Sequence, residues 1–177
     1  MQTEYPEIIP ARLNRILVPL DFSAHSMKAL SYARLFAAQF GATVVLLHVS
    51  EPVVYGTDFG YAPVPPTTLE HDCEEAERGR LEGVAEKERA AGVNIEVAQR
   101  VGRPHLEIVD AARELKADLI LVTTHGYTGL KHVLLGSTAE LVVRHAPCPV
   151  LVVRDQVQSP VTEPEKAATG EVAEMPR

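Results

Sequence analysis

Two short segments of the sequence carry residue types that could bind a phosphorylated ligand. The first, residues 19–23, places Asp21 directly after an apolar run, and the second, residues 123–138, contains Gly126 and Gly136. Glycines let backbone N–H groups approach an anion closely, and a helix that starts just after Gly136 would add free donors and the positive end of its dipole. Glycine spacing alone is a weak signal, because a tight turn before an ordinary helix gives the same pattern.

Short apolar runs and amphipathic segments alternate along the chain. The runs are rich in β-branched residues and are predicted to be strands: 15–20, 43–49, 93–101, 118–122 and 149–153. All but the third are apolar on both faces, which is typical of parallel strands covered by helices on each side. Helical patterns fill the gaps at 27–40, 69–90, 104–115 and 137–145. This order predicts one α/β domain, residues 14–154, with a doubly wound, mostly parallel five-stranded sheet.

Local signals place the ends and faces of these helices. Ser23 is the expected N-cap of the first helix, and Gly41 follows its last residue. In the charged 69–90 helix, the predicted inward stripe is Leu69, Cys73, Ala76 and Val84. Ligands of parallel sheets bind beyond the carboxyl ends of the strands, where the strand order reverses, so residues 19–23 and 123–138 are placed to meet there.

Composition excludes several classes of protein. The chain has 177 residues and a net charge of −7, and this acidic balance argues against nucleic acid as a partner. Two cysteines cannot form a disulfide framework, no apolar run approaches the ~20 residues that span a bilayer, and the first 15 residues lack a signal-peptide pattern. We therefore expect a cytoplasmic protein with no membrane partner.

Three segments fall outside the predicted strands and helices. Residues 1–13 are assigned as an N-terminal extension, and residues 51–68 as a Pro/Gly/Tyr-rich loop of a length typical of binding loops and lids. Residues 155–177 hold five acidic and two basic residues, three prolines and no aromatic residue. Such a segment cannot bury enough apolar surface to order itself, so it is predicted to be a disordered tail.

The sequence resembles the universal stress protein family over residues 15–153. The resemblance rests on ILVPLDFS at 16–23, VLLHV at 45–49, ADLILV at 117–122, THGYTGLKHVLLGS at 124–137 and RHAPCPVLVV at 144–153. It implies a sheet order of 3-2-1-4-5, with the reversal between the first and fourth strands. It also implies binding of an adenine nucleotide, ATP foremost, with or without Mg²⁺.

Members that bind ATP carry the motif G-x2-G-x9-G-[S/T]. Gly126, the nine residues 127–135, Gly136 and Ser137 match its second half, but Thr123 stands where the motif has its first glycine. The Thr123 side chain would either crowd the nucleotide or offer its hydroxyl as a partner, and the sequence leaves both open.

The same resemblance assigns roles to individual residues. Asp21 would accept a hydrogen bond from the adenine amino group, although capping the first helix is its plain alternative, a task for which Ser23 is also available. The predicted nucleotide-binding residues are Pro19, Leu20, Asp21, Val49, Val122, Thr123, Gly126, Gly136, Ser137 and Thr138.

Neither catalytic nor metal-binding residues are assigned. His125 and His132 lack ligand partners at a suitable spacing, and His48, within an apolar run, is interpreted as a packed, hydrogen-bonded core residue. The main hypothesis is a nucleotide-dependent regulator of the stress response that acts on an unknown protein partner. Its alternatives are a nucleotide-independent interaction module, which Thr123 favours, and a slow ATPase or self-phosphorylating protein that uses Ser137 or Thr138.

The last predicted strand suggests a partner. Residues 150–153 are apolar and uncharged, and a bare edge strand of this kind is rarely left unpaired. The family resemblance implies pairing of this strand across a two-fold axis, so we expect a homodimer.

Overall fold

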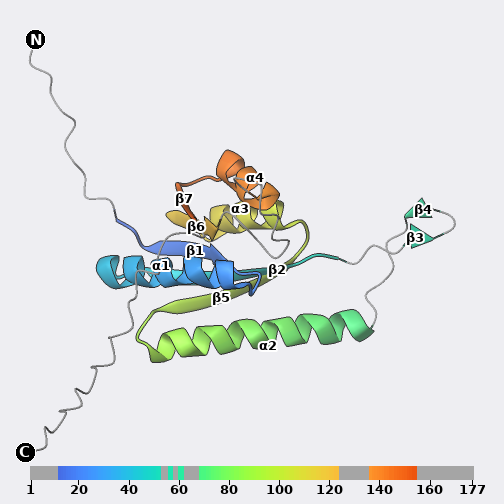
Figure 1. Cartoon of the computed structure of the whole chain (residues 1–177), viewed down its shortest axis with the longest axis horizontal. Helices are drawn as coiled ribbons and strands as arrows, with labels where there is room; N and C mark the ends of the chain where they lie inside the picture. The colour runs from blue at the N-terminus through green and yellow to red at the C-terminus, as the bar shows by residue number, and fades with distance from the viewer. Residues whose placement is uncertain (1–11, 53–55, 58–59, 62–67, 124–135, 155–177) are drawn as a thin grey trace, which may run out of the picture.

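The computed structural model describes residues 12–52, 56–57, 60–61, 68–123 and 136–154 (Figure 1). Its core is a five-stranded parallel sheet with the order β5-β2-β1-β6-β7. Along the chain the elements are β1 Arg15–Pro19, α1 Ala24–Phe40, β2 Thr43–Ser50, β3 Gly56–Thr57, β4 Gly60–Tyr61, α2 Thr68–Ala90, β5 Ile95–Val101, α3 Pro104–Glu114, β6 Leu119–Thr123, α4 Ser137–His145 and β7 Val150–Val153. This confirms the predicted fold class and the order 3-2-1-4-5, counted over the strands of the large sheet.

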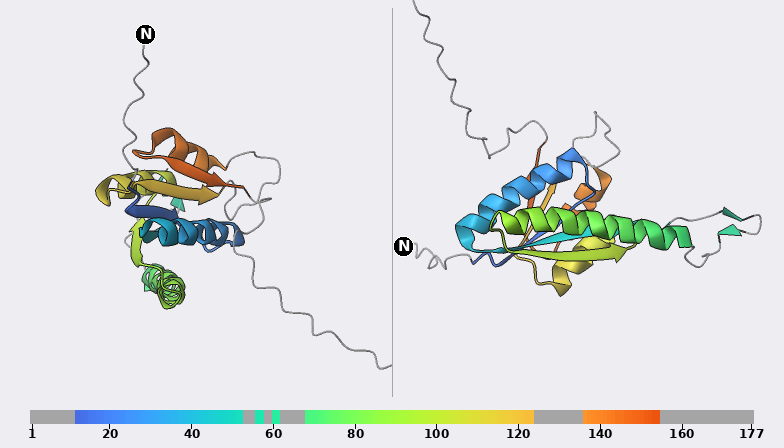
Figure 2. Two further views of the ribbon diagram at one scale, coloured as in Figure 1. Left: turned by 90° about the vertical axis from the view of Figure 1, so that its left-hand side faces the viewer. Right: turned by 90° about the horizontal axis from the view of Figure 1, so that it is seen from below.

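Helices cover both faces of this sheet, as predicted (Figures 1 and 2). On one face, Leu30 of α1 and Leu81 of α2 belong to a core cluster that includes Val44 of β2. On the other, Val142 of α4 joins α3 in a second cluster that includes Val45 of β2. Because successive strand residues point to opposite faces, each strand contributes to both clusters, which we call the α1/α2 face and the α3/α4 face.

The ends of α1 follow from its sequence. Ser23 is the N-cap, and its Oγ accepts a hydrogen bond from the Ser26 N–H at 3.1 Å. At the other end Gly41 adopts φ 67°, a left-handed conformation that glycine takes without steric cost, and its N–H donates to the Ala37 carbonyl. Both predicted ends of this helix are confirmed.

The inward stripe predicted for α2 is wrong at Cys73 and Ala76 and confirmed at Val84, while the Leu69 side chain lies outside the described residues. Cys73 and Ala76 are exposed, whereas Leu81 and Ala85 are buried and Val84 is partly buried. The reason is the position of the helix, because Leu81, Val84 and Ala85 lie where α2 packs against the sheet, while its first turns extend past the strand ends (Figure 1). An amphipathic pattern cannot reveal which turns of a helix have a sheet beside them.

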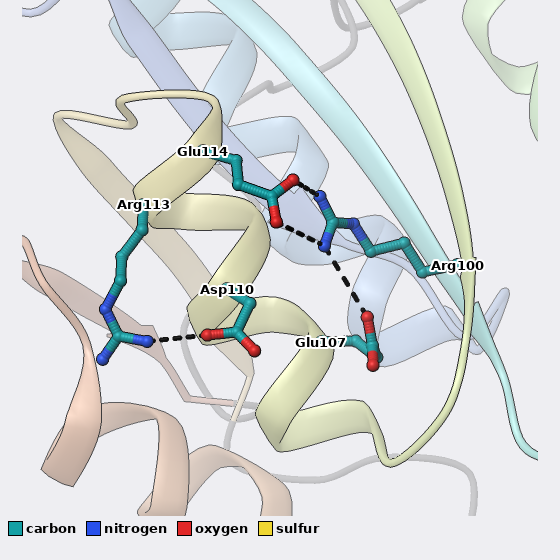
Figure 3. A network of polar contacts seen from close by, with 5 residues as sticks. All are labelled: Arg100, Glu107, Asp110, Arg113 and Glu114. Carbon is teal, nitrogen blue, oxygen red and sulfur yellow. Dashed lines mark hydrogen bonds and ion pairs between the residues drawn. The ribbon is translucent and has the colours of Figure 1, made fainter.

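The β5 edge of the sheet is tied to α3 by charged side chains (Figure 3). Arg100 of β5 forms a hydrogen-bonded ion pair with Glu114 and lies 3.7 Å from Glu107. The hydrogen bond from Arg100 lowers the pKa of Glu114 and raises that of Arg100. Arg113 and Asp110 form a separate pair on the surface of α3, at 2.7 Å.

The predicted segments outside the domain lie mostly beyond the described residues. This holds for residues 1–11 of the extension and for the whole predicted tail, 155–177. Within the predicted 51–68 loop, the described residues form the small antiparallel pair β3–β4, which the sequence did not indicate. Across the described part of the chain, no helix has the length and apolar character needed to cross a bilayer.

Candidate functional site

The carboxyl ends of β1, β2 and β6 meet at one edge of the sheet, where the strand order reverses. Val49 and Val122 both belong to the α3/α4 cluster, and Val122 is only 7% exposed. Pro19 follows two residues after Leu17, a member of the same cluster, so strand alternation places it on the same face. The structure therefore places these three predicted apolar residues on one face, near the carboxyl ends of neighbouring strands, with Val122 buried and Pro19 and Val49 partly buried.

Leu20 is placed differently from its predicted neighbours. Its side chain is 3% exposed and packs in the α1/α2 cluster, on the opposite face from Val49. Its backbone continues the pairing with β2, because its N–H donates to the Leu47 carbonyl at 2.8 Å. Of Leu20, therefore, only the backbone lies where residues 19–23 and 123–138 are predicted to meet.

Asp21 does not cap α1 in this structure. Its Oδ1 accepts hydrogen bonds from the Ser23 N–H at 3.0 Å and from the Ser23 Oγ–H at 2.6 Å. Ser23 in turn caps the helix, so the hydroxyl serves both the carboxylate and the helix end. The half-buried Asp21 carboxylate is therefore held in a fixed orientation at the end of β1.

Thr123, the departure from the nucleotide motif, ends β6 and is half-buried. Its register partner in β7 is Val153, which packs in the α1/α2 cluster. Paired residues in register share a face, so the Thr123 side chain lies on the α1/α2 face, opposite to that of Val122.

The start of α4 supplies backbone donors at the same side of the sheet. Gly136 is its N-cap in extended conformation (φ −63°, ψ 148°), with no side-chain capping bond, and the Glu140 N–H donates to the Gly136 carbonyl at 2.9 Å. The N–H groups of Ser137 and Thr138 precede this first helical bond, so the helix itself does not satisfy them. Gly126 lies outside the described residues.

His48 is a buried, hydrogen-bonded residue, as predicted, but its partners were not foreseen. Its Nδ1 lies 2.7 Å from the Leu20 carbonyl oxygen, its ring centroid lies 4.6 Å from that of Phe22, and Glu77 of α2 lies near its Nε2. Arg80 of α2 lies over the Phe22 ring, 4.4 Å from its centroid. No sequence signal places α2 here, because the position of this helix depends on the connection before it.

The two thiols have different surroundings. Burial, and secondarily the charge of Asp118, raises the pKa of Cys148, which makes its thiol a poor nucleophile. Cys73 lies exposed on α2. Among the described residues, no three His, Cys, Asp or Glu side chains gather as a metal site would require.

The comparison with known families decides the identity of the fold. The model of the Universal stress protein family matches residues 12–154, which is most of the chain. The chain belongs to the universal stress protein family.

Relatives agree with this family assignment. Universal stress protein MJ0531 of Methanocaldococcus jannaschii is 37% identical over 142 residues, covering 79% of this chain and 81% of that protein. The solved structure of universal stress protein UspA from Lactobacillus plantarum is similar with a TM-score of 0.69 and 28% identity, covering 81% of this chain and 99% of that one. A universal stress protein solved in complex with cAMP gives a TM-score of 0.60 and 26% identity, covering 81% and 98%.

Proposed function

We propose that this universal stress protein binds an adenine nucleotide, ATP foremost, at the edge where β1 and β6 end, and that binding changes the surface it offers to a protein partner. The observation that carries the proposal is the combination of an apolar surface with an oriented carboxylate. Pro19, Val49 and Val122 share one face of the sheet, and Ser23 orients Asp21 just after β1, two residues beyond Pro19. The base would lie against these apolar residues, and its amino group would donate a hydrogen bond to the Asp21 carboxylate.

The start of α4 suits the phosphates. The N–H groups of Ser137 and Thr138 come before the first helical hydrogen bond, and the dipole of α4 places partial positive charge at this end. Gly136 has no side chain to keep an anion away from these donors. The similar universal stress protein solved in complex with cAMP, also an adenine nucleotide, supports the same ligand class for this chain.

The first experiment tests for bound nucleotide directly. Freshly purified protein is denatured, and released small molecules are identified by chromatography and mass. ATP, ADP or AMP at near one molecule per chain is the expected result, and calorimetric titration with ATP and with GTP then measures preference for adenine. A chain that arrives empty and binds neither nucleotide at millimolar concentration would contradict the proposal and favour the nucleotide-independent interaction module.

Gly136→Val tests the location of the site. The extended backbone of Gly136 accommodates valine, so the fold should persist while the new side chain covers the first turn of α4. We expect ATP affinity to fall about tenfold or more, the equivalent of losing a charge-assisted hydrogen bond. Gly83→Ala in α2, where an added Cβ meets nothing within 4 Å, is the matched control and should bind ATP as the wild type does.

Thr123→Gly tests the departure from the family motif. With the Thr123 side chain on the α1/α2 face, away from Val122, we expect the affinity for ATP to change by less than about threefold. Tighter binding would instead mean that the side chain crowds the ligand, and weaker binding that its hydroxyl is a contact.

The proposed assembly is a homodimer paired through β7. This strand lies at an edge of the sheet and reads Val-Leu-Val-Val, with Leu151 exposed. Antiparallel pairing of two such strands about a two-fold axis would satisfy both open edges. A monomeric mass at micromolar concentration in solution scattering would contradict it.

A further inference from the structure

His48 lies between the turn that holds Asp21 and α2, with one ring nitrogen toward each. The imidazole lies in β2 and is 8% exposed, and its Nδ1 lies 2.7 Å from the Leu20 carbonyl oxygen. A carbonyl can only accept, so Nδ1 carries the proton and donates. In the neutral ring, Nε2 therefore carries a lone pair.

That lone pair faces a carboxylate. Nε2 is buried without a hydrogen bond in the described part of the chain, and Glu77 Oε2 lies 3.4 Å away. Glu77 also accepts a hydrogen bond from the Ser50 hydroxyl, which holds the carboxylate in place. Two acceptors thus flank the ring, and the arrangement is complete only when both nitrogens carry a proton.

The same segment of α2 supports the turn that holds Asp21. Phe22, the next residue, has φ 61°, a left-handed conformation that is uncommon outside glycine and costs free energy unless its surroundings support it. Its ring contacts both the His48 ring and the Arg80 guanidinium. Arg80 follows Glu77 by about one helical turn, so the Arg80–Phe22 contact and the Glu77–His48 contact depend on the same part of α2.

We propose that His48 is a positioning residue for the turn that holds Asp21. When its ring is protonated, Nε2 donates a hydrogen bond to Glu77 and so attaches α2 to this turn. Adenine nucleotide then binds more tightly in mildly acidic solution. The inference rests on the proposed nucleotide site, but the α2 attachment itself can be measured without nucleotide. Nucleotide binding and protonation of His48 favour each other because the nucleotide binds more tightly to the conformation in which α2 is attached to the Asp21 turn.

Charged groups on the surrounding elements define what else could respond to pH. From α2 they are Glu77 and Arg80, and from the turn Asp21, bound to Ser23. β5 contributes the neutral Gln99, the register partner of His48, whose amide donates to the Glu74 carbonyl. His25 in the first turn of α1 is the remaining histidine near this turn in sequence, which makes it the matched control.

The test compares ATP affinity at about pH 6 and about pH 8, on either side of the ordinary imidazole titration, in the wild type, Glu77→Gln, His48→Gln and His25→Gln. ATP itself titrates in this range, so the quantity compared is each variant's affinity ratio between the two pH values. We expect the wild-type ratio to exceed that of Glu77→Gln and His48→Gln by about two- to fivefold, the range for partly exposed ion pairs. In Glu77→Gln, the new side-chain amide would donate to the neutral ring and remove the need for the second proton.

A second measurement separates this inference from the proposed function. Amide hydrogen exchange of α2 in nucleotide-free protein, corrected for the intrinsic pH effect, should show greater protection at the lower pH in the wild type and His25→Gln but not in Glu77→Gln. If no variant binds nucleotide, the proposed function fails while this difference still supports the His48–Glu77 link. Equal protection at both pH values in the wild type would overturn the link, as would loss of the pH effect in His25→Gln.

Discussion

The two edges of the sheet are built in opposite ways. Along β5, polar and charged side chains are interspersed with apolar ones, Arg100 is paired with α3, and α2 covers one face. Along β7 the four residues are all apolar, and Leu151 is exposed. Charges on an edge strand discourage further strand addition, whereas a bare apolar edge invites it. Among the described strands, β5 is therefore the charged edge and β7 the apolar edge that the proposed dimer would use, and the following predictions test both halves of that statement.

The largest effect is expected where α2 covers the β5 edge. Leu81 is fully buried in the α1/α2 cluster, and Leu81→Ala should lower the free energy of unfolding by about 2–4 kcal/mol through lost burial and a cavity. Urea unfolding measures the change. Leu106→Ala, on an exposed side chain of α3, is the control and should stay within about 0.5 kcal/mol of wild type. Equal losses in the two variants would mean that α2 is not anchored as described.

A charge on the open edge comes next. Leu151→Lys should raise the dimer dissociation constant about tenfold to a hundredfold, because two lysines would approach each other across the proposed pairing of β7. Sedimentation velocity over a concentration series gives the constant. A lysine on the other edge, Val101→Lys at the exposed end of β5, should leave the dimer dissociation constant unchanged. If Val101→Lys dissociates the dimer and Leu151→Lys does not, the roles of the two edges are reversed.

The two cysteines allow a further test of the two edges. Cys148 lies just before β7, whereas Cys73 lies on α2, the helix beside β5. Burial and the Asp118 charge raise the pKa of Cys148, and the thiolate is the reactive form. At about pH 8, iodoacetamide should therefore alkylate Cys73 about tenfold faster or more. Peptide mass spectrometry over a time course separates the two sites. Similar rates would show that the entrance to β7 opens readily to solvent.

The smallest effect concerns the ion pair at the β5 edge. Arg100→Met should lower Tm by about 1–3 °C at neutral pH, as expected for a partly exposed pair. Because Arg100 lowers the pKa of Glu114 below its ordinary 4.5, the pair stabilises the fold above that pH and loses its effect as pH falls through the lowered value. The difference between wild type and variant should accordingly vanish in acid. A difference that persists at about pH 2 would assign the stabilisation to packing of the arginine stem.

The sequence could predict those features of the fold that depend on residues close together in the chain. The strands are apolar runs with helices between them, so their order along the chain and the covered faces follow from periodicity alone. Ser23 and Gly41 fix α1 for the same reason, since caps act within a few residues. The order of strands in space came from the family resemblance, which carries information that periodicity lacks.

What could not be predicted depends on register between distant segments. The inward face of α2 was misplaced because the sequence does not state how far the helix extends past the sheet. The contacts of Glu77 and Arg80 with His48 and Phe22 depend on that same placement. The face on which Thr123 lies likewise becomes known only through its pairing with Val153.

The position of β1 also has a consequence for synthesis of the chain. β1 is synthesised before the other four strands of the large sheet, yet it lies in the middle of that sheet, between β2 and β6. The Asp118 carboxylate just before β6 accepts hydrogen bonds from the Asn14 and Arg15 N–H groups. About a hundred residues must therefore leave the ribosome before the second edge of β1 is covered. During that interval the second edge of β1 is open to wrong partners, a hazard that ends when β6 pairs with it.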